Sequence, residues 1–280
     1  MILVTGSSGT IGSEVLKELT AAGQSVRAAY RTRPPSAPGV QAARLDLATG
    51  EGLDAAVAGA DAVFLLVGAV ADQTAAELRV VEAAKRARVK RLVKLSVLGA
   101  ETEAYSFAKI HRPVERAIEA SGIPYTFLRP GSFMQNFVTY YGESIRQQNA
   151  FYLPCGNTRE AHVDARDIAR VAARALTSTG HEGKAYVLTG PELLTYAEAA
   201  AKLSAVLGRT ITYVDMSETD YKKLMADVGV PADYVDQLLE LYRFIRSHGG
   251  VTSPAIKDVT GREPISFDQF ARDHADAWKK

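Results

Sequence analysis

The fold of this chain is decided by Thr5-Gly6-Ser7-Ser8-Gly9-Thr10-Ile11-Gly12, a glycine-rich stretch that directly follows the apolar run Ile2-Leu3-Val4. Beyond this stretch, Val15, Leu16 and Leu19 recur at the spacing of one helix face. The T-G-x-x-G-x-x-G spacing between a strand and a helix is the setting in which a dinucleotide binds. We therefore predict a Rossmann-type α/β fold whose first turn holds the diphosphate of a nicotinamide cofactor.

The positions of this stretch have distinct expected roles. Gly6 permits a tight turn, Gly9 lets the backbone approach the diphosphate, and Gly12 allows the helix to pack closely on the strand. The helix that begins here also supplies free N–H groups and the positive end of its dipole. The cofactor-binding residues predicted from this turn are Gly6, Ser8, Gly9, Thr10, Ile11 and Gly12.

The first half of the chain continues with alternating strand and helix signals. The predicted strands are residues 25–30, 42–47, 62–67, 91–96 and 125–128, and the predicted helices between them are residues 53–58, 75–87 and 109–121. Strands that are apolar on both faces and separated by helices are typical of a parallel sheet covered on both sides. We therefore expect a doubly wound parallel sheet.

After about residue 130 the pattern is less regular. Helix signals lie at residues 165–176, 196–207, 218–228, 234–247 and 267–278, and short strand signals lie at residues 185–188 and 211–214. We expect residues 1–150, with a return segment at about 161–190, to form the NAD(P)-binding domain. Residues 191–280 are expected to form a small α/β substrate-binding region that interleaves with the sheet.

Composition excludes several classes of protein. The 33 basic and 32 acidic residues almost cancel, so neither a nucleic-acid surface nor a membrane patch is expected. The single cysteine, Cys155, and the five scattered histidines predict no metal site, and no residues suggest a flavin. The chain opens directly into a strand, so we expect no signal peptide and a cytoplasmic location. The expected partner is a small-molecule substrate, and a homodimer is compatible with the sequence.

The end of the second predicted strand bears on which nicotinamide cofactor binds. An acidic residue there would mark NAD, but this strand ends in Tyr30-Arg31-Thr32-Arg33. Arg31, the stronger candidate, or Arg33 can hold a 2′-phosphate through charge-assisted hydrogen bonds, so we expect NADPH in preference to NADH. The alternative is that both arginines are solvated loop charges. Asp46 is placed either to meet the adenine amino group or to cap the following turn.

Further stretches carry a family resemblance when they are taken together. They are residues 5–12, Arg31, Ala108-Lys109-Ile110-His111-x-x-x-Glu115, residues 121–130, Phe133-Met134-Gln135-Asn136, residues 163–169 and residues 185–191. The chain thereby resembles the NmrA-like, atypical short-chain dehydrogenase/reductases over nearly its whole length. Members of that family include quinone reductases, azo- and triphenylmethane-dye reductases, and nucleotide-sensing regulators. The resemblance implies the fold and the cofactor, but it leaves the substrate open.

Three residues near the start of the helix predicted at 109–121 are candidates for the chemistry. Lys109 matches a family lysine and should lie near the cofactor, with a solvated surface lysine as the alternative. His111 matches a histidine of the quinone and dye reductases and would donate to the substrate, unless it is a packing histidine. Tyr105 and Lys109 form the Y-x-x-x-K pattern of classical short-chain dehydrogenases, but Ser96 lies too close in sequence for the classical arrangement. We therefore expect Tyr105 to be an exposed loop residue, although it remains a candidate proton donor.

The ends of two predicted strands should lie beside the nicotinamide. Val67 and Gly68 end one of them, and Gly68 would permit a close approach. After the other, Pro130 should contact the cofactor, and the next residues could wall a pocket for a flat substrate or belong to the core. The predicted substrate residues are Phe133, Met134, Asn136 and Phe137.

The leading hypothesis for function is an NAD(P)H-dependent reductase, NADPH-preferring, which transfers a hydride to a quinone or a similar flat, electron-poor acceptor. The alternative is an NADP(H)-binding redox sensor with little or no catalysis, because no catalytic acid is assured. A sugar-nucleotide epimerase or dehydratase is a third hypothesis, less favoured because that chemistry needs a firmly placed tyrosine.

Overall fold

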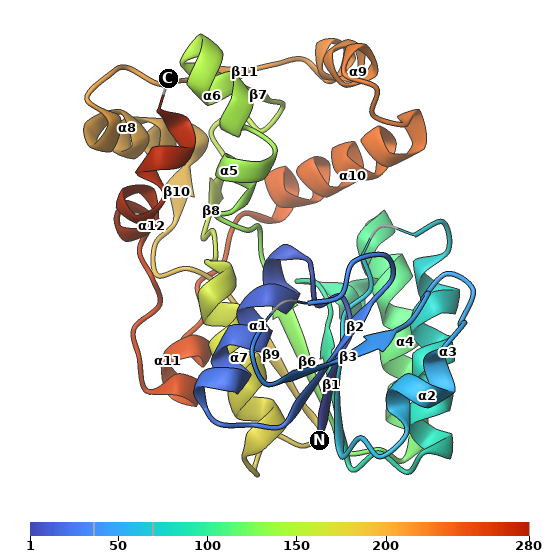
Figure 1. Cartoon of the computed structure of the whole chain (residues 1–280). Coiled ribbons are helices and arrows are strands. Elements are labelled where there is room, and N and C mark those ends of the chain that lie inside the picture. The colour runs from blue at the N-terminus through green and yellow to red at the C-terminus, as the bar shows by residue number, and fades with distance from the viewer. Residues whose placement is uncertain (36, 69, 280) are drawn as a thin grey trace.

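The glycine-rich turn belongs to a parallel sheet that forms the base of the molecule (Figure 1). The computed structural model describes residues 1–35, 37–68 and 70–279, and within them seven strands form this sheet. In their order across the sheet they are β3 (Val40–Arg44), β2 (Val26–Tyr30), β1 (Ile2–Val4), β4 (Ala62–Leu65), β5 (Arg91–Leu95), β6 (Tyr125–Pro130) and β9 (Lys184–Leu188). The chain order reverses beside β1, which makes the β1/β4 boundary a topological switch point where ligands bind.

Helices cover both faces of the sheet. On one face lie α1 (Thr10–Ala21), α7 (Ala165–Thr177) and α11 (Ala255–Thr260), and on the other lie α2 (Leu53–Val57), α3 (Gln73–Arg86) and α4 (Ser106–Ser121). Apolar strand residues such as Phe64 and Leu92 are fully buried between these layers. The predicted doubly wound parallel sheet is therefore confirmed. None of the helices in the described ranges is long and apolar enough to cross a membrane.

Most element boundaries agree with the sequence pattern within a few residues, but the last helix does not. The segment predicted as one helix over residues 267–278 is α12 (Phe267–Asp273) followed by the 3₁₀ helix η2 (Ala275–Trp278). The fully buried indole of Trp278 donates its N–H to the carbonyl of Phe137, 2.8 Å away. This contact fixes the position of the chain end, and the helix breaks at His274.

The rest of the chain forms an upper lobe above the carboxyl edge of the sheet (Figure 1). It contains α5 (Asn136–Thr139), α6 (Gly142–Gln148), α8 (Tyr196–Leu207), α9 (Glu218–Asp227), α10 (Ala232–His248), α12 and η2. Two small strand pairs complete it: β7 (Ala150–Leu153) pairs with β11 (Thr212–Asp215), and β8 (Arg159–Glu160) pairs with β10 (Leu194–Thr195).

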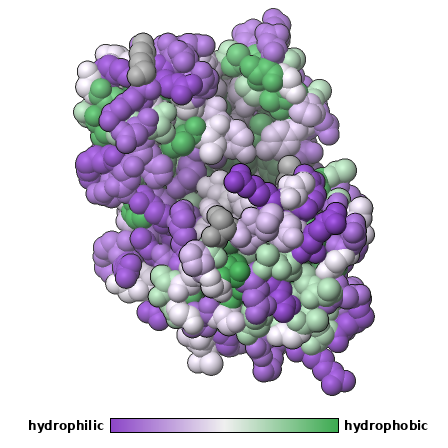
Figure 2. Space-filling view, viewed as in Figure 1, coloured by the Kyte–Doolittle hydropathy of each residue, from purple (hydrophilic) through white to green (hydrophobic). Residues whose placement is uncertain are grey.

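The core of the upper lobe joins the middle of the chain to its end. Phe137 and Phe151 pack with Tyr196, Phe270 and Trp278 in one cluster of buried side chains. Conversely, α11 contributes to the core of the sheet and packs on α7. Because the segment before residue 150 already packs in the upper lobe, we propose that the boundary lies near residue 134 and not at 150. Figure 2 shows the surface hollowed between the two lobes.

Candidate cofactor and acceptor site

Two glycines of the turn have no room for a side chain. Gly6 has a φ of +61°, and a Cβ there would lie 2.8 Å from the carbonyl oxygen of Leu66. A Cβ at Gly12 would lie only 2.1 Å from the carbonyl oxygen of Gly6, well inside van der Waals contact. At Gly9 the nearest atom would be 3.4 Å away, which is an ordinary contact. Gly6 and Gly12 are therefore required by the turn itself, whereas Gly9 leaves its outer side open.

Buried hydroxyl groups fix this turn to the neighbouring strands. Thr5 Oγ1 donates to the carbonyl of Leu66, just after β4 (2.9 Å). Ser7 Oγ donates to the carbonyl of Ala29 in β2 (2.6 Å). The N-terminus of α1 behind the turn has no side-chain cap, and Ser8, Gly9 and Thr10 are exposed. The first N–H groups of a helix have no intrahelical acceptor. The turn thus presents fixed, free N–H donors to solvent, which suits a diphosphate.

The residues predicted to select the cofactor follow β2 and β3. Arg31 and Arg33 are both exposed, so either guanidinium is available to a phosphate group. Asp46 Oδ1 accepts the N–H of Ala48 at 2.8 Å, which is the turn-capping arrangement left open by the sequence. Its contact with adenine, like the role of the arginines at a 2′-phosphate, stays a prediction.

The loop after β4 lies at the same edge of the sheet as the glycine turn. Val67 is buried and packs in the core, whereas Gly68 is exposed with open space where a Cβ would be. β4 is the neighbour of β1 in the sheet. Gly68 therefore stands beside the turn with an unobstructed backbone, and its contact with the nicotinamide stays a prediction.

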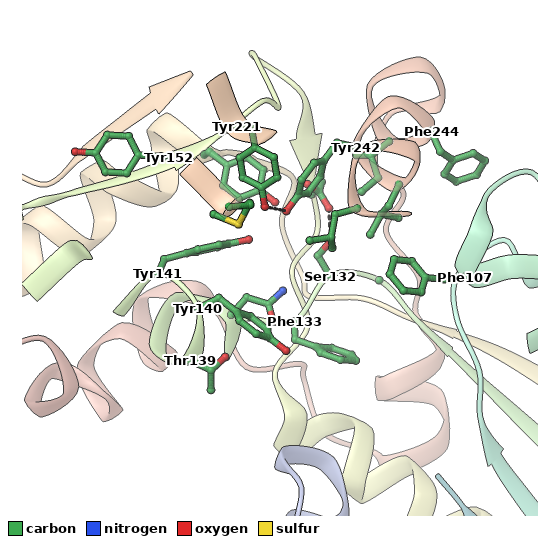
Figure 3. Close-up of a pocket in the computed structure, with 18 of the residues that line it drawn as sticks. Phe107, Ser132, Phe133, Thr139, Tyr140, Tyr141, Tyr152, Tyr221, Tyr242 and Phe244 are labelled. Carbon is green, nitrogen blue, oxygen red and sulfur yellow. Dashed lines mark hydrogen bonds between the residues drawn. The ribbon is translucent and has the colours of Figure 1, made fainter. Parts of the chain in front are cut away.

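A cavity of about 1040 Å³ lies between the upper lobe and the carboxyl edge of the sheet (Figure 3). On the sheet side it is bounded by Leu98 after β5 and by Pro130 and Phe133 at and after the end of β6. On the upper side, Tyr141, which directly precedes α6, and Tyr221 of α9 point into the same space. Carboxyl ends of parallel strands share one edge, so the cavity and the glycine turn open on the same side of the sheet.

The cavity divides the predicted substrate residues into two groups. Phe133 and Asn136 line it, as does Pro130. Met134 and Phe137 are buried in the core of the upper lobe and are not among the described residues that line the cavity. Met134, which precedes α5, and Phe137, which lies within it, thus occupy core positions, the alternative that the sequence left open, and their contact with substrate stays a prediction.

Tyr105 is not the exposed loop residue that the sequence led us to expect. Its ring is buried, lines the cavity, and packs against Phe244 of α10 with ring centroids 4.7 Å apart. Its hydroxyl donates to the carbonyl of Leu98. Burial, together with the charge of Glu101, raises the pKa of Tyr105. The hydroxyl is thus engaged with the backbone and is a weak acid, so the geometry gives little support to a role as proton donor.

The start of α4 is joined to α10 by a second contact. The N–H of Ser106 donates to Glu240 Oε2 at 3.0 Å, and the hydroxyl of Ser106 donates to the same oxygen at 2.6 Å. The carboxylate of Glu240 therefore caps α4 from the upper lobe. Lys109, one turn further along, is exposed and lies outside the described lining of the cavity. Its charge contributes to the lowered pKa of Glu240, after the hydrogen bonds from Ser106.

His111 lies in a buried ionic cluster rather than in the cavity. Its Nδ1 is 3.0 Å from Lys94 Nζ, and Lys94 also pairs with Glu77, with both of these side chains fully buried. Burial, followed by the charge of Lys94, holds the pKa of His111 well below its usual value. The neutral ring therefore accepts the hydrogen bond from Lys94. His111 is not among the described residues lining the cavity, so its predicted donation to substrate is not supported by its position.

Several cavity residues were missed by the sequence analysis. Tyr140 and Tyr141 come from the segment between α5 and α6, Tyr221 from α9, Tyr242 from α10, and Glu160 from β8. Nothing local to these residues distinguishes them from other tyrosines or acids. They become neighbours only because the upper lobe is assembled from separate stretches of chain. Eleven of the twelve tyrosines of the chain lie after residue 104, and this concentration was the only available hint.

Fold and site together define a Rossmann-type dinucleotide-binding protein with an acceptor cavity over the carboxyl edge of its sheet. The model of the NmrA-like family matches residues 1–270, and the chain belongs to that family. The chain is 40% identical to an NAD(P)H azoreductase of Xenophilus azovorans, with 99% of each chain covered.

Solved structures agree in fold and overall arrangement. The chain is similar to an NADPH-dependent quinone oxidoreductase of Escherichia coli complexed with NADPH, with a TM-score of 0.87, 27% identity, and 98% of this chain and 99% of that chain covered. It is also similar to the Citrobacter sp. triphenylmethane reductase complexed with NADP(H), with a TM-score of 0.86, 26% identity, and 98% and 100% of the two chains covered. The resemblance noted from the sequence motifs is thereby confirmed.

Proposed function

We propose that this protein is an NADPH-dependent reductase that transfers a hydride to a flat, electron-poor acceptor such as a quinone or an azo compound. The observation that carries the proposal is the position of the aromatic-lined cavity at the carboxyl edge shared with the glycine turn. Adjacent strands of a sheet are about 4.8 Å apart, so β1 and β6, three strands apart, are separated by about 14 Å. An extended dinucleotide bound at the turn can therefore reach the cavity across β4 and β5.

The bound cofactor would supply a hydride from its nicotinamide ring, which together with one proton converts a quinone to a hydroquinone. The residues of the chain would bind, orient and exclude water. The N–H groups at the start of α1 would hold the diphosphate, and Gly68 would leave room for the ring. Phe133 and Tyr141 would enclose a flat acceptor between apolar surfaces.

The preference for NADPH rests on the arginines after β2. Both are exposed, and no acidic residue stands in the sequence Tyr30-Arg31-Thr32-Arg33 to bind a ribose 2′-hydroxyl. Support also comes from the two structural relatives, whose complexes contain NADPH and NADP(H). Lys109 is the remaining polar candidate near the start of α4, because it is exposed and makes no ion pair within the described residues.

The experiment that tests the proposal is NADPH oxidation by the purified protein, followed by absorbance, with a panel of quinones, azo dyes and ketones. Turnover with quinones or azo dyes supports the reductase. Binding of NADPH with no oxidation by any acceptor contradicts it and favours the redox sensor, for which the next comparison is the conformation with NADPH against that with NADP⁺.

A variant of Lys109 tests whether this residue contributes to the site. Lys109→Ala should lower turnover by about 10-fold, since one charge-assisted contact to cofactor or acceptor is lost. The matched control is Lys223→Ala, an exposed lysine on α9 in the upper lobe that is not among the described residues lining the cavity. Equal turnover of the two variants would remove Lys109 from the site.

A further inference from the structure

Glu160 is a buried carboxyl group on the wall of the cavity, and one of its two oxygens has no hydrogen-bond partner among the described residues. It ends β8, is only 5% exposed, and lines the cavity described above. Its Oε2 accepts a hydrogen bond from the hydroxyl of Ser132, which follows β6. Its Oε1 is buried and has no hydrogen-bond partner among the described residues. A buried carboxyl oxygen without a partner is costly for a protein to maintain, which makes a ligand its natural partner.

The protein offers this carboxyl group no cation. The basic side chain next to it in sequence, Arg159, turns outward and binds the carbonyl of Leu193 and the carboxylate of Glu198. The nearby ring of His162 is completely buried, and this burial lowers its pKa, so the ring is neutral near pH 7. No lysine, arginine or histidine is among the described residues that line the cavity.

The only other charged group on the cavity wall, within the described residues, is also a carboxylate. Glu143 stands at the rim, where its side chain is 68% exposed and pairs with Arg146. Much of the remaining wall is aromatic. Tyr140 and Tyr141 lie on one side, and Tyr221 and Tyr242, whose hydroxyls are 3.4 Å apart, lie on the other (Figure 3). Aromatic faces attract cations and repel anions through the quadrupole of the ring.

We infer that the cavity selects acceptors that are organic cations: flat conjugated molecules bearing an ammonium, amidinium or iminium nitrogen, which Glu160 receives. This inference rests on the proposed function and specifies its substrate class. A cationic nitrogen would satisfy the free oxygen of Glu160 by a charge-assisted hydrogen bond or ion pair, while the tyrosine rings enclose the conjugated part. Sulfonated or carboxylated acceptors of the same shape would meet two carboxylates and no positive charge, so they would be rejected.

The test compares three azobenzene dyes that differ only in one para substituent: an ammoniomethyl, a methyl or a sulfonate group. Binding to the protein loaded with NADP⁺ is measured by equilibrium dialysis, since the oxidised cofactor permits no turnover. The ammoniomethyl dye should bind at least about 10-fold more tightly than the methyl dye, and the sulfonate more weakly than both. If the wild-type protein binds the ammoniomethyl dye no more tightly than the methyl dye, the inference is overturned without recourse to any variant.

The variant Glu160→Gln assigns the preference to its residue. It keeps the shape of the side chain and removes the charge, so the ratio of the two affinities should fall to about one. The matched control, Glu119→Gln, alters an exposed carboxylate on the outer side of α4 and should keep the wild-type ratio. Ser132→Ala, which keeps the carboxyl group and removes only the hydroxyl that orients it, should retain a preference for the cation. A ratio in Glu160→Gln equal to that of the wild type would overturn the assignment.

Failure of this inference and failure of the proposed function give different results. If neutral quinones are reduced but the three dyes bind alike, the reductase stands and the substrate class is wrong. If the ammoniomethyl dye binds preferentially and no acceptor oxidises NADPH, the cation site stands and the reductase is wrong.

Discussion

The glycine turn and the acceptor cavity lie on the same edge of one sheet, but they are built in different ways. The turn is eight consecutive residues whose shape depends on backbone atoms, and a single added carbon at Gly12 would lie 2.1 Å from the carbonyl oxygen of Gly6. The cavity is bounded by side chains from residue 97 to residue 251, held by the packing of the upper lobe. A single added atom in the turn should therefore abolish cofactor binding and lower stability sharply. Substitutions in the cavity should instead change the selectivity for acceptors step by step.

The largest effect is expected at the turn. Gly12→Ala forces a methyl group against backbone that cannot move independently, so we expect a loss of at least about 3 kcal/mol in stability, together with loss of NADPH binding. Unfolding by denaturant measures the stability, and titration with NADPH measures the binding. Gly9→Ala is the matched variant, because its Cβ meets only Gly6 at 3.4 Å. It should keep its stability and bind NADPH about 10-fold more weakly. A stable, NADPH-binding Gly12→Ala would contradict this account of the turn.

The next effect concerns the cofactor and not the fold. Arg31→Ser should raise the Kd for NADPH by about 10- to 100-fold and leave the Kd for NADH unchanged, because only the 2′-phosphate loses a charge-assisted bond. Arg33→Ser should have the smaller effect of the two. Fluorescence titration with both cofactors gives the ratio directly. Equal losses for NADPH and NADH would show that Arg31 does not contact the 2′-phosphate.

The third effect concerns His111, whose burial should make the stability of the protein depend on pH. The buried ring has a lowered pKa, so the folded protein resists its protonation while the unfolded chain takes up a proton near the usual value of 6.5. Stability contributed by this difference is present above about pH 6.5 and falls as the pH drops, with a slope of up to about 1.4 kcal/mol per pH unit for each such histidine. His162, also buried with a lowered pKa, adds to the slope.

His111→Asn separates the structural role from a catalytic one. The amide oxygen can still accept from Lys94, so stability at pH 7.5 should change by about 1 kcal/mol or less, its decline towards pH 5 should be shallower, and turnover should persist. His111→Leu leaves Lys94 with one partner fewer and should cost about 2 kcal/mol or more. Chemical denaturation across this pH range gives both results. Lost turnover in a stable His111→Asn protein would restore the histidine to the active site.

The smallest effect is expected at Tyr105. Tyr105→Phe removes the hydroxyl that donates to Leu98 and keeps the ring against Phe244, so it should cost about 1 kcal/mol of stability. The rate of NADPH oxidation should stay within about 2-fold of wild type. A 100-fold slower rate with unchanged acceptor binding would instead identify Tyr105 as the proton donor and place the chemistry on the wall of the cavity.

These two regions also explain how much could be predicted from the sequence. The sheet, its flanking helices and the glycine turn follow from local signals: glycine spacing, apolar strands and helical periodicity act within a few residues of where they are seen. The same holds for Gly122, whose positive φ ends α4 at the predicted residue.

The cavity could be predicted only in its sheet-side part. Pro130 and Phe133 follow a strand whose place was evident, whereas Glu160 and Tyr242 are separated by more than eighty residues and meet through tertiary packing alone. The surroundings of His111 could not be predicted for a similar reason. Its partners, Lys94 and Glu77, come from β5 and α3, and a motif centred on α4 carries no information about them.

The cap that Glu240 supplies to Ser106 spans 134 residues of sequence. During synthesis α4 must therefore emerge with a frayed first turn, and this turn is completed only after α10 has left the ribosome. A nascent chain arrested before residue 240 should exchange the amide hydrogen of Ser106 rapidly, while the folded 280-residue chain should protect it. The same amide would report, in the folded protein, each movement of α10 away from the start of α4.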